Sequence, residues 1–146
     1  MRLGSLIRVC LESAGLIRRS ALTGLVRAQH PGMDELADGR LCVVRDGGIE
    51  KWACFRCPGG CGHKIQLSLN PNRRPRWIVR LDWLDRPTLS PSVHQTNECR
   101  CHFWVRRGHV EWCRDSGHRR QGPTEGQDLT DPRGRPTPAQ ARLGHS

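Results

Sequence analysis

Two cysteine clusters, far apart in the chain, constrain what this sequence can fold into. Cys57 and Cys61 flank a Pro-Gly-Gly turn, and Cys99 and Cys101 come directly before His102. A Pro/Gly turn lets the backbone curl so that both thiols reach one ion at about 2.3 Å, and the Cys99-x-x-His102 gap is common in zinc sites. The spacing therefore predicts a zinc site formed by Cys57, Cys61, Cys99 and His102.

Other ligand sets remain open at this point. Cys101 is an alternative ligand, and so is Cys113, because a predicted hairpin over residues 102–114 can return it towards the site. His63 is a third alternative, since Cys61-Gly-His63 together with Cys99-x-x-His102 matches the local spacing of a Rieske-type centre. That arrangement would bind a 2Fe-2S cluster in an electron-transfer protein instead of zinc.

The composition explains why a metal would help this chain to fold. Hydrophobic residues make up 36%, with two Phe and no Tyr, against about 45–50% in an average domain. A thin core favours a covalent or metal staple. Charged residues such as Arg8 and Glu12 interrupt the apolar N-terminus, so we expect no secretory segment, no transmembrane segment and a reducing, cytoplasmic location. Clustered cysteines there more often bind metal than form disulfides.

The middle of the chain has the pattern of a β-rich module. Short alternating runs are separated by Gly, Asn and Pro turns such as Asp46-Gly47-Gly48 and Arg107-Gly108. Such runs predict a small, zinc-stabilised β-meander, similar to a zinc ribbon, over residues 36–114. The expected strands are residues 40–45, 51–56, 63–69, 76–82, 102–106 and 109–114.

The two flanks have a different texture. Residues 3–28 place apolar side chains at helical spacing and predict an amphipathic helical extension over residues 1–33, for which Met33 offers an alternative translation start. Residues 115–146 contain almost no large apolar side chain, and such a composition predicts a disordered tail.

The charge of +10 and the pI near 10.2 raise nucleic acid as a partner. The excess is spread along the chain, and 22 of the 24 basic residues are Arg, a skew that coding bias alone can produce. The best candidate surface for phosphate contacts and base stacking consists of Arg73, Arg74, Arg76, Trp77 and Arg80.

Three ordered motifs resemble those of a bacterial domain-of-unknown-function family, family 6527. They are Cys57-x-x-x-Cys61-Gly62, then Leu89-Ser90-Pro91-Ser92, then Cys99-x-x-His102-Phe103-Trp104. The chain departs from the family pattern twice, with Gly59 in place of a middle cysteine and Cys101 in place of a serine. Because members often lie beside genes for ubiquitin-like proteins and their conjugating enzymes, the resemblance implies a protein partner from such a system.

No catalytic centre is recognisable in the sequence. The carboxylates are scattered, no Ser or Cys lies in a known nucleophile motif, and four protein ligands leave zinc no position for water. The favoured function is therefore a structural zinc-binding module that recruits a protein, with exposed tryptophans among Trp77, Trp83, Trp104 and Trp112 as contacts. A basic nucleic-acid-binding module is the second hypothesis, and a catalytic zinc enzyme is the third.

Overall fold

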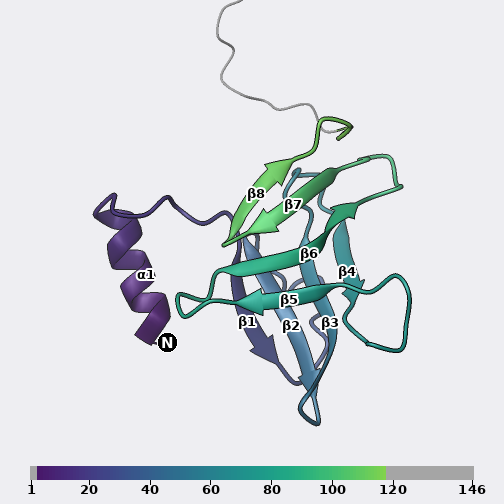
Figure 1. Cartoon of the computed structure of the whole chain (residues 1–146), viewed down its shortest axis with the longest axis horizontal. Coiled ribbons are helices and arrows are strands. Elements are labelled where there is room, and N and C mark those ends of the chain that lie inside the picture. The colour runs from purple at the N-terminus through teal and green to yellow at the C-terminus, as the bar shows by residue number, and fades with distance from the viewer. Residues whose placement is uncertain (1–2, 118–146) are drawn as a thin grey trace, which may run out of the picture.

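The computed structural model describes residues 3–117, which form one helix and two four-stranded sheets (Figure 1). The first sheet has the order β1-β2-β3-β4 and the second has the order β5-β6-β7-β8. The elements are α1 (Leu3–Ser13), β1 (Thr23–Arg27), β2 (Arg40–Asp46), β3 (Ile49–Arg56), β4 (Lys64–Ser68), β5 (Ile78–Leu81), β6 (Pro87–His94), β7 (His102–Arg106) and β8 (His109–Trp112). The predicted class, mainly β with an N-terminal helix, is confirmed.

Each sheet is largely an antiparallel meander. β2-β3-β4 and β5-β6-β7-β8 pair antiparallel, whereas β1 pairs parallel to β2 at the edge of its sheet. β6 pairs with β7 through Leu89↔Val105 and then Val93↔Phe103. Between these two pairs, three residues of β6 lie opposite one residue of β7. The residues between Leu89 and Val93 therefore form a bulge in the middle of the second sheet.

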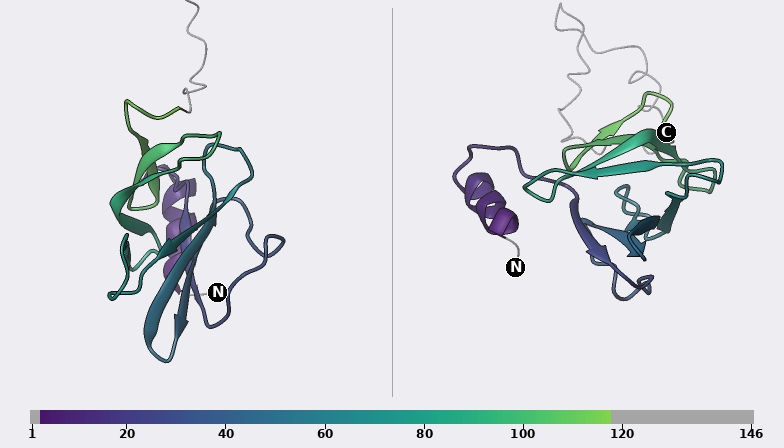
Figure 2. Two further views of the ribbon diagram at one scale, coloured as in Figure 1. Left: turned by 90° about the vertical axis from the view of Figure 1, so that its right-hand side faces the viewer. Right: turned by 60° about the horizontal axis from the view of Figure 1, so that its bottom comes forward.

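The core lies between the two sheets, which Figure 2 shows as two layers. Phe55 from β3 and Phe103 from β7 are fully buried and meet edge to face, with ring centroids 6.4 Å apart. Aliphatic side chains that alternate along the strands fill the rest: Leu41, Val43, Ile65, Leu67, Leu89, Val93 and Val105. Because these residues face inwards, their neighbours in sequence face outwards.

Two segments differ from the expected elements. The predicted helix over residues 3–28 is wrong in its second half, since α1 ends at Ser13 and residues 23–27 form β1. β6 was not among the expected strands, and it contains two prolines. Pro87 begins the strand and Pro91 lies in the bulge, the places where a sheet tolerates proline.

The N-terminal helix takes little part in the core. No residue of α1 is buried, and α1 reaches the β5–β6 turn through a hydrogen bond of 2.7 Å from Ser5 to Asp85 (Figure 2). Within the described residues, no helix has the length and apolar character needed to span a membrane. Apart from residues 115–117, the tail expected to be disordered lies outside the part of the chain that the structure describes.

Candidate active site and metal site

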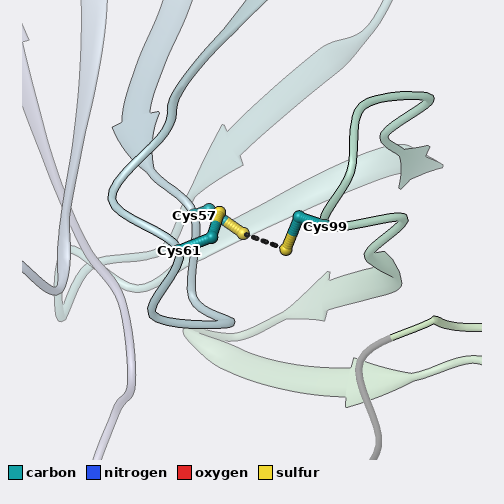
Figure 3. Close-up of side chains that lie close together, drawn as sticks. All are labelled: Cys57, Cys61 and Cys99. Carbon is teal, nitrogen blue, oxygen red and sulfur yellow. Dashed lines mark hydrogen bonds between the residues drawn. The ribbon is translucent and has the colours of Figure 1, made fainter.

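The two cysteine clusters meet at one end of the sheets. The Sγ atoms of Cys57, Cys61 and Cys99 all lie within 4.8 Å of one another, an arrangement that can hold a metal ion (Figure 3). The thiol of Cys101 joins them, 3.5 Å from Cys57 and 2.8 Å from Cys99. Sulfur ligands of a tetrahedral zinc ion at about 2.3 Å would lie about 3.8 Å apart, close to the Cys57–Cys99 separation of 3.9 Å.

Tight turns hold each pair of cysteines. Cys57 follows β3, its N–H donates to the His63 carbonyl, and Gly60 donates back to the Cys57 carbonyl. Gly60 and Gly62 have φ near +75°, which a side chain would disfavour. On the other side Arg100 donates to the Asn97 carbonyl and has φ of 44°, in the turn between Cys99 and Cys101. The backbone thus presents four thiols to one small volume.

The pKa values of these thiols follow from their burial and mutual contacts. Burial raises the pKa of Cys57 to about 12 and raises that of Cys101 as well. Burial also acts to raise the pKa of Cys99, but hydrogen bonds from Cys101, Cys61 and Cys57 outweigh it and lower the pKa. The protein alone therefore favours few thiolates, and a bound cation would supply the charge needed to deprotonate the others.

The fourth predicted zinc ligand, His102, points to other partners. Its Nε2 lies 3.1 Å from the Ser92 hydroxyl, and its Nδ1 lies 2.7 Å from a carboxylate oxygen of Asp115. Because the carboxylate accepts, Nδ1 carries the proton and Nε2 is free to accept the hydrogen bond of Ser92. Both ring nitrogens are thus occupied, and the structure does not bring His102 together with Cys57, Cys61 and Cys99.

The bulge in β6 and the first residue of β7 bring Ser92 and His102 together. Val93 and Phe103 pair and face the core, so Ser92 and His102, their neighbours in sequence, lie on the outer face of the second sheet. The indole N–H of Trp77 donates to the Ser92 carbonyl at 3.2 Å. A bulge commonly re-aims a side chain beside an active site, and here it places the Ser92 hydroxyl beside an imidazole on the neighbouring strand.

His102 itself is held from several sides. Its backbone N–H donates to the Ser116 hydroxyl, and its carbonyl accepts from the Cys113 N–H. Its ring stacks on that of His94, the residue opposite it in the sheet, with centroids 4.6 Å apart and planes 18° apart. These contacts fix both the backbone and the ring plane of His102.

Ser92, His102 and Asp115 form a hydrogen-bonded series of hydroxyl, imidazole and carboxylate. The hydrogen bond from His102 lowers the pKa of Asp115, so this carboxylate stays ionised through the neutral range. In that state it fixes the tautomer of the imidazole and stabilises the imidazolium formed when the ring takes a proton. The series can therefore activate the Ser92 oxygen as a nucleophile.

The other candidate ligands are separated between the two sites. His63 has its Nδ1 3.3 Å from the Cys61 sulfur, at the exposed edge of the cysteine cluster. Cys113 lies beside His102 and Asp115, and these three residues form a second group of potential ligands within 4.8 Å. The Rieske arrangement needs His63 and His102 at one cluster, and His102 is directed to Ser92 and Asp115 instead.

The basic residues proposed for binding are exposed, whereas most of the proposed tryptophans are half-buried. Arg73, Arg74 and Arg76 are exposed in the loop between β4 and β5, and Arg80 is exposed on β5. Trp77 is half-buried, packs against the core and donates its indole N–H to the Ser92 carbonyl. Trp83 is 67% exposed, whereas Trp104 and Trp112 are half-buried.

The ligand set predicted from the sequence placed His102 at the metal and included neither Ser92 nor Asp115 among the site residues. The serine stood in the Leu-Ser-Pro-Ser motif without a known nucleophile signature, and Asp115 fell in the first position of the expected tail. The sequence contained only an indirect indication of this pair. Ser92 lies in a Ser-Pro-Ser segment, in which the proline favours a bulge, and His102 begins the next strand. Only the strand register shows that the two meet.

The sequence matches the BubE family, described as a bacterial ubiquitination-like system serine protease, over residues 26–113. The matched segment is more than half of the chain and contains the four clustered cysteines, Ser92 and His102. It ends two residues before Asp115. No curated protein matches the chain, and no solved structure does.

Proposed function

We propose that this chain, which belongs to the BubE family, is a serine protease whose nucleophile is Ser92. The observation that carries the proposal is the series Ser92–His102–Asp115, with separations of 3.1 and 2.7 Å between the hydrogen-bonded atoms. Serine proteases are recognised by this geometry and these roles rather than by position in the sequence. The family description supports the same chemistry and links the chain to a bacterial ubiquitination-like system.

The geometry supports the following reaction. The Ser92 oxygen attacks the carbonyl carbon of a peptide or related amide bond while His102 Nε2 takes the hydroxyl proton. His102 then gives this proton to the leaving amine as the carbon–nitrogen bond breaks, which leaves an acyl group on Ser92. Water, activated by the same imidazole, releases the acid and restores the hydroxyl. Asp115 keeps Nδ1 protonated throughout.

The bulge also offers donors for the charge that develops on the substrate oxygen. The pairing of β6 with β7 is interrupted between Leu89 and Val93, and backbone N–H groups released from a sheet ladder can serve as an oxyanion hole. Because Pro91 has no N–H, we expect the backbone N–H of Ser92 to point to the carbonyl oxygen of a bound substrate.

For the metal site, we propose structural zinc bound by Cys57, Cys61, Cys99 and Cys101. Thiolates in a closed tetrahedral set suit zinc, and a closed set leaves no open position for catalysis. Cys101 is fully buried and lies against two of the other sulfurs, which is why it replaces His102 in this proposal. Because Cys101 directly precedes His102, the ion would anchor the start of β7, where the catalytic imidazole lies. Reduced thiolate ligands fit a cytoplasmic location.

As the substrate, we propose a protein of the ubiquitin-like conjugation system named in the family description. Cleavage of a peptide or isopeptide bond in such a protein uses the reaction given above without change. From the sequence we expected a purely structural interaction module. The protease proposed here replaces it, but the proposed partner is still a protein of a ubiquitin-like system.

The test is covalent labelling of the full-length protein with a small alkyl fluorophosphonate, followed by mass-spectrometric mapping. We expect one adduct at Ser92, and none after Ser92→Ala. His102→Ala should slow labelling by at least about 100-fold, because general-base catalysis contributes about 10² to 10⁴. Ser90→Ala, which removes a hydroxyl from the same bulge, is the matched control and should label normally.

Labelling of the wild type at other serines only, or at Ser92 with equal rate after His102→Ala, would remove the basis of the proposal. Melting curves of the variants show whether each remains folded.

A further inference from the structure

An open hollow of about 520 Å³ lies on the outer face of the second sheet and is lined by residues of β6, β7 and β8. Its lining is mainly apolar, and Trp104 supplies the largest side chain. Thr88 and Ser90 line it from β6, whereas Arg106 and Glu111 contribute charged side chains. We call it the Trp104 hollow.

The strand pattern places the Trp104 hollow next to the proposed catalytic residues. Ser90 precedes Ser92 by two residues on β6, and Trp104 follows His102 by two residues on β7, so each pair shares one strand. His102, Trp104 and Arg106 share the outer face of β7, because Phe103 and Val105 between them are buried in the core. The Trp104 hollow therefore lies on the same face of the sheet as His102.

Neighbouring contacts hold this wall in place. The Arg106 guanidinium lies 5.1 Å from the centroid of the Trp104 ring, and Glu111 holds the same guanidinium at 2.9 Å. Arg106, itself held by Glu111, therefore restrains the indole before any substrate arrives. A rigid aromatic side chain binds a partner at low entropic cost, because little freedom remains to be lost.

A second hollow lies on the other side of Ser92 along β6. It has a volume of about 310 Å³ and is lined by Trp77, Val93, His94 and the loop that follows, together with β4. Its polar character is greater, with Lys64, Gln66 and Gln95 in its lining. In the sequence, Ser92 lies between the β6 residues that line the first hollow and those that line the second.

From this placement we infer that the Trp104 hollow receives an apolar side chain of the substrate, within two residues of the bond that is cleaved. The inference rests on the proposed protease function and adds a preference for substrates with an apolar side chain beside the cleaved bond. An apolar side chain buried against Trp104 gains free energy, whereas a charged one loses its hydration.

The experiment uses the full-length protein and a peptide library, with cleavage sites identified by mass spectrometry. For the wild type we expect aliphatic or aromatic residues at one fixed position beside the cleaved bond. Trp104→Ala should lower kcat/KM for the best peptide by about 10- to 100-fold, the usual range for loss of apolar contacts in a specificity pocket. Trp104→Phe should restore most of the preference.

Two controls separate selection from catalysis. Trp83→Ala removes an equally large but 67% exposed ring from the β5–β6 turn, and should leave both rate and preference unchanged. Labelling by the small fluorophosphonate, which does not reach the hollow, should proceed at the same rate in Trp104→Ala and wild type.

Three outcomes would overturn the inference. The first is cleavage without an apolar preference, and the second is a preference that survives Trp104→Ala. In the third, labelling of Trp104→Ala falls as steeply as its peptide cleavage, which would show that Trp104 acts through Ser92, His102 and Asp115. If the wild type is not labelled at Ser92 at all, the protease function itself fails, and the inference fails with it.

Discussion

Asp115 is the residue whose role is easiest to isolate, because its side chain is 63% exposed and contributes nothing to the core. Its carboxylate accepts the hydrogen bond from His102 Nδ1 at 2.7 Å. Asp115→Asn keeps the shape but allows the imidazole to adopt the wrong tautomer. We expect kcat to fall by about 10⁴, as for the equivalent change in a serine protease, with KM little changed. Steady-state kinetics on a cleaved peptide would measure this.

The same variant predicts a pH dependence of stability. The hydrogen bond from His102 lowers the pKa of Asp115 in the folded protein. The stabilisation from this contact should therefore be present above the unfolded value of about 3.9, and be lost as the pH falls through the folded pKa. The difference in unfolding free energy between wild type and Asp115→Asn should shrink only in that acidic window. A difference that disappears between pH 5 and 7 would contradict this assignment.

At the scale of elements, the loop before β7 serves two sites with adjacent residues. Cys101 faces the cysteine cluster, while His102 faces Ser92. The alternation of side chains at a strand start explains how neighbours can point to opposite sides. A proposed metal ligand and the proposed general base are therefore neighbours in the chain.

Replacing single cysteines tests the ligand set. Cys101→Ser should remove or greatly weaken metal binding and lower the melting temperature, because zinc binding contributes to folding in small modules. Cys113→Ser is the matched control, since this half-buried cysteine belongs to the group around His102, and should retain one metal ion per chain. Metal content by mass spectrometry, measured beside thermal unfolding, gives both results. Equal metal loss in the two variants would contradict the proposed set.

Much of the element pattern could be predicted from the sequence, and the reason is local. Alternation and Gly turns mark β2, β3, β4, β7 and β8, and the Pro-Gly-Gly turn marks the first pair of cysteines. β6 could not be predicted in this way, because its bulge and two prolines break the period of two. The meeting of Ser92 with His102 and Asp115 depends on that bulge and on the turn after β8. Both are properties of the register rather than of any one segment.

At the scale of the whole molecule, β1 ties the N-terminal region to the sandwich. Leu22, beside β1, is 2% exposed and donates its N–H to the Gly108 carbonyl at the β7–β8 turn. α1, in contrast, buries no residue. The region predicted as one helical extension, residues 1–33, therefore contains two parts with different contributions to stability.

Two deletions should separate these parts. Removing residues 1–14 should leave the melting temperature close to that of the full chain and retain labelling at Ser92. A chain that begins at Met33 lacks β1 and Leu22, and we expect it to be strongly destabilised, since loss of a buried leucine alone costs about 2–5 kcal/mol. Chemical denaturation of both forms would measure the difference. Equal stability of the two would show that β1 is dispensable.

The division between Cys101 and His102 determines whether the molecule contains a catalytic serine beside a structural metal, or a metal site alone. X-ray absorption at the zinc edge of the purified full-length protein tests it most directly. We predict four sulfur ligands at about 2.3 Å and no nitrogen. A first shell of three sulfurs with one nitrogen at about 2.0–2.1 Å that disappears in His102→Ala would show that His102 binds the metal, and would contradict its role at Ser92.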